Sequence, residues 1–128
     1  MLTQAKSPHQ MGQQNEECIQ QCIESYRHTL QAVRYCLDKG GDYSSSNMIQ
    51  RLLDCAEICR TTVSYLIRSS DKYSTICGSC AEICLLCAVD CERFTDDSAM
   101  NACAQQCRNC AEYCQLMLAN ASEMSRVS

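Results

Sequence analysis

Cysteines recur along this chain at alternating intervals of three and four residues, and this spacing constrains the fold more than any other feature. Two long series occupy the second half of the chain: Cys77, Cys80, Cys84, Cys87 and Cys91, then Cys103, Cys107, Cys110 and Cys114. An α-helix brings side chains three and four positions apart onto one face. The spacing therefore predicts two helices whose core-facing positions carry thiols where leucine or isoleucine is usual.

The first half of the chain shows the same pattern with fewer thiols. One helical face combines Cys18, Cys22 and Cys36 with Ser25, Thr29 and Ala32, and a second combines Met48, Leu52, Cys55, Cys59 and Thr62. We therefore predict helices at about 13–39, 47–68, 72–94 and 98–122, after a loose N-terminal arm over residues 1–12. Short connections make successive helices antiparallel. The expected fold is all-α: a single domain, 1–128, forming an up-down-up-down antiparallel four-helix bundle with a cysteine-lined core.

The redox state of the thiols follows from the expected compartment. Fourteen cysteines among 128 residues are typical of a secreted disulfide scaffold. However, the first 17 residues lack the apolar segment and cleavage site of a secretory signal, and no uninterrupted apolar run is long enough to span a bilayer. We therefore expect a cytoplasmic protein with reduced thiols and no membrane partner. Helical neighbours four residues apart also have Cβ atoms about 5–6 Å apart, too far for a disulfide.

Charge and side-chain chemistry exclude other classes of function. The net charge is −4, and the 11 basic residues are spread along the chain, so we expect no nucleic-acid partner. No catalytic triad or carboxylate pair is recognisable, which predicts that the protein is not an enzyme. His9 and His28 lie outside the thiol stripes, and we expect both to be solvated.

Thiols without histidine or carboxylate on the same face form a soft ligand set, and Cu(I) fits such a set best among the common metals. If each ion binds two thiolates and each thiolate bridges two ions, the ratio is about one Cu(I) per cysteine. One monovalent cation per thiolate also leaves the interior neutral. The candidate ligands for these multiple Cu(I) ions are all the cysteines and two methionines on the same stripes: Cys18, Cys22, Cys36, Cys55, Cys59, Cys77, Cys80, Cys84, Cys87, Cys91, Cys103, Cys107, Cys110, Cys114, Met48 and Met100.

Folding the two hairpins against each other predicts approximate levels along the bundle. One end collects Cys36, Met48, Cys91, Met100 and Cys103. The middle holds Cys55, Cys59, Cys84, Cys87, Cys107 and Cys110. The other end gathers Cys18, Cys22, Cys77, Cys80 and Cys114. Met48 and Met100 are either core filler or a softer site at which copper is admitted, and an isolated thiol such as Cys36 can serve packing alone.

Several alternatives stay open. Two facing C-x-x-x-C pairs could instead build a tetrahedral four-thiolate zinc site in a metal-stabilised structural bundle. A thiol redox or iron–sulfur protein is a third possibility, although the spacing lacks the clustered cysteines of ferredoxins. A second apolar stripe, one residue beyond the first, either seals the core or forms a self-association surface. It comprises Ile19, Ile23, Tyr26, Leu30, Val33 and Leu37, and then Ile49, Leu53, Ala56, Val63 and Ile67.

The cysteine motifs resemble those of the bacterial copper storage proteins of the cytosolic kind. The motifs that carry the resemblance are C-x-x-C-A-E-I-C-x-x-C-x-x-x-C (77–91), M-x-x-C-x-x-x-C-x-x-C-A-E-x-C (100–114), D-C-A-E-I-C (54–59) and C-I-Q-Q-C (18–22). The resemblance implies a four-helix bundle that sequesters many Cu(I) ions on cysteine thiolates, assembles as a homotetramer and admits copper at one end. Ser25, Thr29, Ala32, Met48 and Met100 stand where further cysteines are expected, which implies a reduced capacity.

Overall fold

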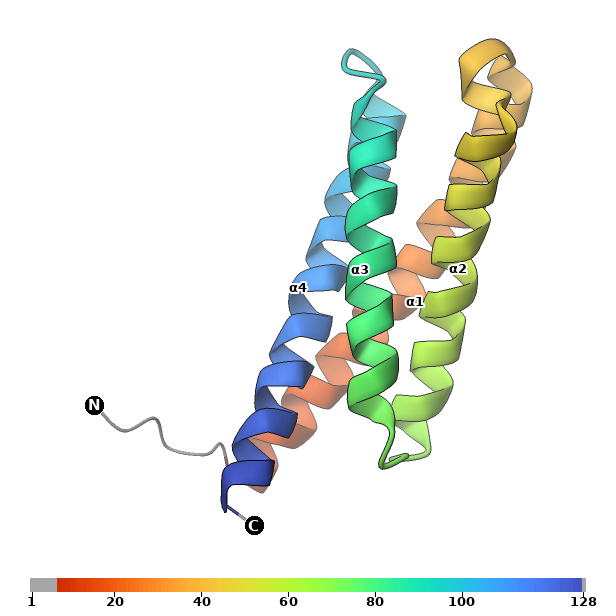
Figure 1. Ribbon diagram of the computed structural model, residues 1–128. Helices are drawn as coiled ribbons and strands as arrows, with labels where there is room; N and C mark the ends of the chain where they lie inside the picture. Colours follow the sequence, from red (N-terminus) through yellow and green to blue (C-terminus); the bar gives the residue numbers. More distant parts are fainter. Residues whose placement is uncertain (1–6, 128) are drawn as a thin grey trace.

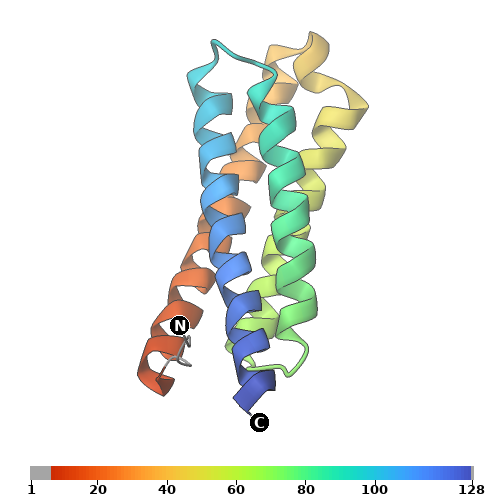
Figure 2. The same ribbon diagram turned by 60° about the vertical axis from the view of Figure 1, so that its left-hand side comes forward.

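The computed structural model describes the backbone of residues 7–127 and the side chains of residues 7–122. This part of the chain forms four long α-helices and one short 3-10 helix: α1 (Pro8–Lys39), η1 (Gly41–Ser44), α2 (Ser46–Ile67), α3 (Tyr73–Glu92) and α4 (Ser98–Val127). Successive helices run in opposite directions beside one another (Figures 1 and 2). The predicted all-α, up-down-up-down antiparallel four-helix bundle with a cysteine-lined core is confirmed.

The two ends of the bundle differ in what covers them. At the η1 end lie η1 and the connection between α3 and α4 (93–97). At the opposite end, which we call the α2–α3 end, lie the α2–α3 connection (68–72), the start of α1 and the last turns of α4 (Figure 1).

Helix α1 starts earlier than the sequence analysis predicted. It begins at Pro8 rather than Gln13, so the predicted loose arm is wrong from Pro8 onward. The Ser7 hydroxyl accepts a hydrogen bond from the Gln10 N–H at 3.2 Å, and the Ser7 N–H donates to Gln10 Oε1 at 2.9 Å. This capping box, with a proline in the first turn, stabilises a helix start. Residues 1–6 of the predicted arm lie outside the described residues.

The other helix boundaries differ from expectation by shorter segments. Helix α1 ends before Gly40 and Gly41, whose φ values of 73° and 57° favour glycine. Helix α2 begins at Ser46, one residue before the predicted start, because Ser45 caps it and accepts a hydrogen bond from the Met48 N–H at 3.2 Å. Helix α3 is shorter than the predicted 72–94, whereas α4 begins as expected and extends beyond the predicted end at 122.

Alanines beside the thiols allow neighbouring helices to approach closely. An alanine follows a cysteine at five positions, and each of these alanines is at most 4% exposed: Ala56, Ala81, Ala88, Ala104 and Ala111. The distance between packed helices depends on the side chains at their contact, so small residues bring helices together. Thiols projecting from different helices can then meet on the bundle axis.

The second apolar stripe is divided between core and surface. Ile19 and Ala56 are buried, and Ile23, Tyr26, Val33, Ile49 and Val63 pack against the core. Four members on α1 and α2 remain exposed: Leu30, Leu37, Leu53 and Ile67. The stripe therefore seals the core along most of its length.

Helix α3 is long and apolar enough, by length and composition, to cross a membrane, with a mean hydropathy of 1.5. Polar residues interrupt this segment, so it contains no uninterrupted apolar run of the kind that a sequence reading would take as a membrane span. Much of this hydropathy comes from the five cysteines of α3, all of which are buried within the bundle. The composition of α3 is that of the core helix of a bundle.

Three aromatic rings and one carboxylate close the η1 end of the bundle. The hydroxyls of Tyr35 and Tyr43 both donate to Asp97 Oδ2, at 2.7 and 2.8 Å. Tyr43 stacks on Phe94 with ring centroids 4.1 Å apart, and Asp97 Oδ1 accepts a hydrogen bond from the Met100 N–H at 3.0 Å. The tyrosine hydroxyl of Tyr35 and the backbone N–H of Met100 contribute to lowering the pKa of Asp97 to about 2. We call Tyr35, Tyr43, Phe94 and Asp97 the aromatic latch.

Replacing Asp97 by alanine should destabilise the bundle by about 2–3 kcal/mol, because it removes a helix cap and the acceptor for two tyrosine hydroxyls. Chemical denaturation of the reduced apoprotein measures this change. The matched control is Asp96→Ala, which removes an exposed carboxylate from the adjacent position. Equal stability of the two variants would show that the latch contributes nothing.

Candidate metal centre

A continuous row of cysteine sulfurs occupies the bundle axis. All fourteen cysteines are buried, and none is in a disulfide. The shortest Sγ–Sγ distances, between 3.6 and 3.9 Å, mostly join different helices. The pairs are Cys18–Cys114, Cys22–Cys110, Cys55–Cys84, Cys55–Cys107, Cys59–Cys80, Cys59–Cys84 and Cys80–Cys84.

These sulfurs gather into four groups in which every sulfur lies within 4.8 Å of the others. Two groups hold four thiols and two hold three: Cys22, Cys80, Cys110 and Cys114; Cys59, Cys80, Cys84 and Cys110; Cys18, Cys77 and Cys114; and Cys55, Cys87 and Cys107. Cys80 and Cys110 belong to both four-thiol groups, and Cys114 joins one of these to a three-thiol group. The remaining group is linked to them through Cys55, whose Sγ lies 3.7 Å from that of Cys84. The groups therefore form a connected chain of sulfurs.

The levels predicted from sequence agree with this arrangement to within about one helical turn. Cys18, Cys77 and Cys114 lie together as predicted, and Cys55, Cys87 and Cys107 form a group as predicted. Cys80 was placed at an end level but contacts Cys59 and Cys84, which were placed in the middle. This error arises because the hairpin lengths alone do not fix the axial offset between neighbouring helices.

The three cysteines nearest the η1 end, Cys36, Cys91 and Cys103, belong to none of the four groups. The Cys36 thiol donates a hydrogen bond to Met100 Sδ at 3.7 Å. Met48 and Met100 are completely buried, and Arg93 Nη2 lies 3.9 Å from Met48 Sδ. Both predicted methionines therefore face the interior, but neither is open to solvent.

Hydroxyl groups interrupt the sulfur row on α1 and α2. Ser25, Thr29 and Thr62 are fully buried on the inward faces where thiols would otherwise continue. The hydroxyls of Thr29 and Thr62 each donate to the carbonyl four residues earlier at 2.7 Å, so the buried oxygens are satisfied within their own helices. The prediction that the α1 wall is poor in thiol is confirmed.

The pKa values of the thiols reflect burial and mutual hydrogen bonding. Burial, with smaller effects from Cys103 and Asp97, raises the pKa of Cys36 to about 11. Hydrogen bonds from Cys110 and neighbouring thiols lower the pKa of Cys80, whereas the same kind of interaction with Cys110 raises the pKa of Cys59. Because a metal takes thiolates, its binding to this interior releases protons.

The two histidines contribute no ligand to these groups. His9 is exposed. His28 is half-buried on α1, where its Nε2 lies 3.9 Å from Glu24 Oε2. Each of the four groups consists of cysteine alone.

The sulfur geometry suits soft metals of low coordination number. A tetrahedral site with metal–sulfur bonds of about 2.3 Å separates its sulfurs by about 3.8 Å, and a linear two-sulfur site with similar bonds separates them by about 4.6 Å. The shortest observed separations, 3.6–3.9 Å, match the tetrahedral value, and the limit of 4.8 Å within each group admits the linear value. Either geometry needs sulfur movements of less than about 1 Å, which rotation of cysteine side chains supplies.

A four-helix bundle whose axis is lined by grouped, buried cysteine sulfurs defines a soft-metal-binding protein. The sequence profile of the copper storage proteins matches residues 11–119, and the chain therefore belongs to the copper storage protein family. The resemblance predicted from the cysteine motifs is confirmed.

Individual relatives share this architecture over most of their length. The cysteine-rich protein YhjQ of Bacillus subtilis (strain 168), described as uncharacterized, is 33% identical over 109 residues, which are 85% of this chain and all of YhjQ. The crystal structure of Nmul_A1745 from Nitrosospira multiformis has a TM-score of 0.79 and 37% identity, covering 84% of this chain and 97% of that one. The Cu(I)-bound copper storage protein BsCsp3 has a TM-score of 0.77 and 31% identity, covering 82% and 98%.

Proposed function

We propose that this protein stores Cu(I) by holding many ions on cysteine thiolates inside the bundle. The observation that carries the proposal is the connected row of buried sulfurs, whose four groups contain no other ligand type. Thiolate-rich sites favour Cu(I), and membership of the copper storage family supports the same metal. BsCsp3, a structural relative, is a Cu(I)-bound protein.

The proposed ligands are all fourteen cysteines together with Met48 and Met100. Bridging by each thiolate gives a capacity of about one Cu(I) per cysteine. At that ratio the charges of metal and thiolate cancel, so the low-dielectric interior carries no uncompensated charge. Cys36 and Met100, with sulfurs 3.7 Å apart, would hold an ion at the η1 end.

We further propose a non-enzymatic, cytoplasmic, single-domain protein that assembles as a homotetramer and has neither a membrane nor a nucleic acid as partner. The family resemblance supports the tetramer and the compartment. The exposed apolar side chains of Leu37, Leu53 and Ile67 on α1 and α2 support self-association, because burial of such residues stabilises oligomers.

The proposed function is tested by titrating the reduced apoprotein with Cu(I) in the presence of the competing chelator bathocuproine disulfonate. We expect about ten or more tightly bound equivalents, as bridging thiolates provide. Saturation at one or two equivalents would overturn the proposal.

One observation favours zinc as a second candidate. Each four-thiol group could supply a tetrahedral zinc site of four thiolates. However, the two groups share Cys80 and Cys110, so filling both would require these two thiolates to bridge a pair of zinc ions. The zinc hypothesis therefore predicts few ions per chain. Metal analysis after expression with both metals present distinguishes it, since zinc without copper would favour a structural metal.

A further inference from the structure

The two four-thiol groups are joined along one edge. They have Cys80 and Cys110 in common, and each adds two further cysteines. Within each group every sulfur lies within 4.8 Å of the other three. Two tetrahedra that share an edge have six corners, and we call the six cysteines at these corners the six-thiol centre: Cys22, Cys59, Cys80, Cys84, Cys110 and Cys114.

One face of this double tetrahedron has the dimensions that a zinc ion requires. The sulfurs of Cys59, Cys80 and Cys84 form a triangle with sides of 3.7, 3.9 and 3.9 Å. A metal with bonds of about 2.3 Å to four sulfurs separates them by about 3.8 Å. In the other group, the sulfurs of Cys22 and Cys110 are 3.6 Å apart. Part of each tetrahedron is therefore already close to its metal-bound size.

All four helices contribute to the six-thiol centre in a two-fold pattern. Helices α3 and α4 each supply two sulfurs four residues apart, and α1 and α2 each supply one. Each group contains both shared sulfurs and one sulfur four residues beyond a shared cysteine, from Cys84 or Cys114. Its last sulfur comes from the α1–α2 hairpin, from Cys59 or Cys22. Exchanging α1 with α2 and α3 with α4 therefore interchanges two nearly equivalent sites.

Neighbouring thiols compensate for the charge of a filled centre. Two divalent cations bring four positive charges and six thiolates bring six negative ones, so the excess negative charge needs hydrogen-bond donors. The Cys55 thiol donates to Cys84 Sγ at 3.7 Å, and Cys18 Sγ lies 3.8 Å from Cys114 Sγ. Both neighbours lie outside the centre, and each faces a sulfur that only one of the two four-thiol groups contains. Hydrogen bonds to metal ligands stabilise the ligand charge.

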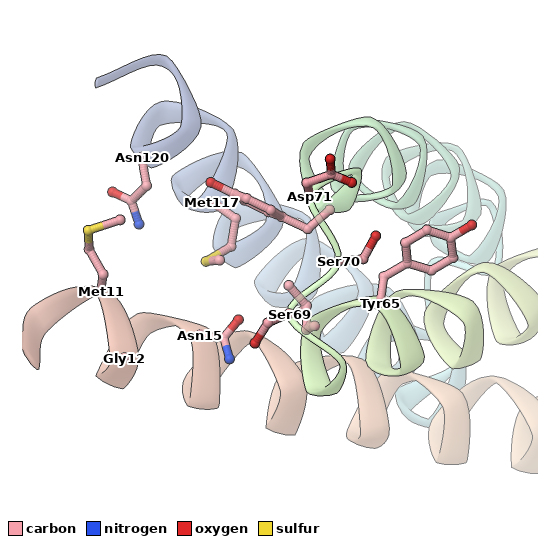
Figure 3. Close-up of a pocket in the computed structure, with 11 residues that line it drawn as sticks. Met11, Gly12, Asn15, Tyr65, Ser69, Ser70, Asp71, Met117 and Asn120 are labelled. Atoms are coloured by element: carbon pink, nitrogen blue, oxygen red, sulfur yellow. The ribbon is translucent and has the colours of Figure 1, made fainter. Parts of the chain in front are cut away.

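The two three-thiol groups lack the fourth ligand that a tetrahedral divalent ion needs. All their cysteines are fully buried. A cavity of about 350 Å³ lies at the α2–α3 end, and Figure 3 shows Met11, Asn15, Met117 and Asn120 around it. Among the described residues that line this cavity there is no cysteine, so water inside it does not complete a thiol site. Tetrahedral four-thiolate sites are therefore confined to the six-thiol centre.

We propose that the six-thiol centre binds a pair of soft divalent cations, zinc or cadmium, bridged by the thiolates of Cys80 and Cys110. Both ions accept four thiolates in a tetrahedron and undergo no redox change. This binuclear site differs from Cu(I) storage in the charge of the ion, in coordination number and in stoichiometry. The ion pair joins all four helices, so it cross-links the bundle when copper is scarce.

Cadmium-113 is the probe that tests this site. The reduced wild-type apoprotein is titrated with the isotope, tight binding is counted by the ultraviolet absorption of cadmium–thiolate bonds, and the bound ions are observed by cadmium NMR. We expect about two tightly bound ions, with two resonances that are scalar-coupled to each other because the same sulfurs bond to both. Saturation at one ion, or two ions without mutual coupling, would overturn the proposal.

A pair of double variants tests the role of the shared sulfurs. The variant C80S/C110S leaves two thiols in each four-thiol group, so it should lose both cadmium ions. The matched control C87S/C107S removes two buried cysteines from the same two helices but outside the centre, and should keep both ions. Equal cadmium binding by the two variants would refute the bridged pair.

If C80S/C110S loses helical content, C22S/C114S decides. It removes two sulfurs from one four-thiol group and leaves the other complete, so binding should fall to about one ion and the coupling should vanish. Retention of two coupled ions would overturn the proposal. The outcomes are also distinct from those for copper: low Cu(I) capacity with two coupled cadmium ions would refute storage and support the centre, whereas full Cu(I) capacity with a single cadmium ion would refute only the centre.

Discussion

Replacing Cys80 and Cys110 together by serine should remove about two to four Cu(I) equivalents, because the capacity is about one ion per cysteine and each bridging thiolate serves two ions. These two cysteines are the members shared by both four-thiol groups. Cys80 Sγ lies 3.9 Å from the sulfurs of both Cys59 and Cys84, and Cys110 Sγ lies 3.6 Å from that of Cys22. Their loss interrupts the sulfur row at its centre. Chelator-competed Cu(I) titration of C80S/C110S measures the capacity.

The bundle should survive this double replacement. Serine occupies less volume than cysteine and introduces a hydroxyl that needs a hydrogen-bond partner in the core. Thr29 and Thr62 show how this interior satisfies such a group, since each hydroxyl donates to the carbonyl four residues earlier. We therefore expect unchanged helical content by circular dichroism, which separates loss of ligands from loss of fold.

The matched control is Cys36→Ser at the η1 end. Cys36 belongs to none of the four thiol groups, and its sulfur contact is the thioether of Met100. We expect this variant to lose at most about one Cu(I) equivalent. If C36S lost as much capacity as C80S/C110S, the groups would have no special role in holding copper.

The sequence predicted the fold because one periodicity occurs four times. Cysteines repeated at helical spacing lie on one face of a helix, and that face is buried in the core. Because the connections are short, four such helices have one simple arrangement, the antiparallel bundle. The start of α1 was missed because Pro8 was taken as a feature of a loose arm, although proline is favoured in a first helical turn. Ser7 and Gln10, three residues apart, form the capping-box pattern that indicated this helix start in the sequence.

The sequence predicted which sulfurs face inward but not which sulfurs meet. The position of a residue in the helical repeat decides which face of the helix its side chain occupies. The sulfurs that contact Cys80 and Cys110, in contrast, depend on the axial offset between neighbouring helices. The aromatic latch was missed for a related reason, because Tyr35, Tyr43 and Asp97 come from three separate segments.

Loading the reduced apoprotein with Cu(I) should raise its melting temperature by tens of degrees. A ligand present at 100 times its dissociation constant stabilises the native state by about 2.7 kcal/mol per site. Five such sites already exceed about 10 kcal/mol, and a chain of this size shifts by roughly 3–5 °C per kcal/mol. The effect is large because the core is poor in large apolar side chains: the fully buried positions are mostly thiols, with Leu52, Met48 and Met100 among the few larger residues.

Differential scanning calorimetry with stepwise addition of Cu(I) measures this stabilisation. The same titration with zinc shows whether the rise in melting temperature is specific to a metal that bridges many thiolates. Because the two four-thiol groups share Cys80 and Cys110, together they can hold at most a pair of tetrahedral zinc ions bridged by these two thiolates. Zinc should therefore raise the melting temperature early and then saturate, whereas Cu(I) should continue to stabilise as further bridging thiolates are engaged. A Cu(I) curve that saturates with the zinc curve would mean that the sulfur row acts as one structural site and not as a store.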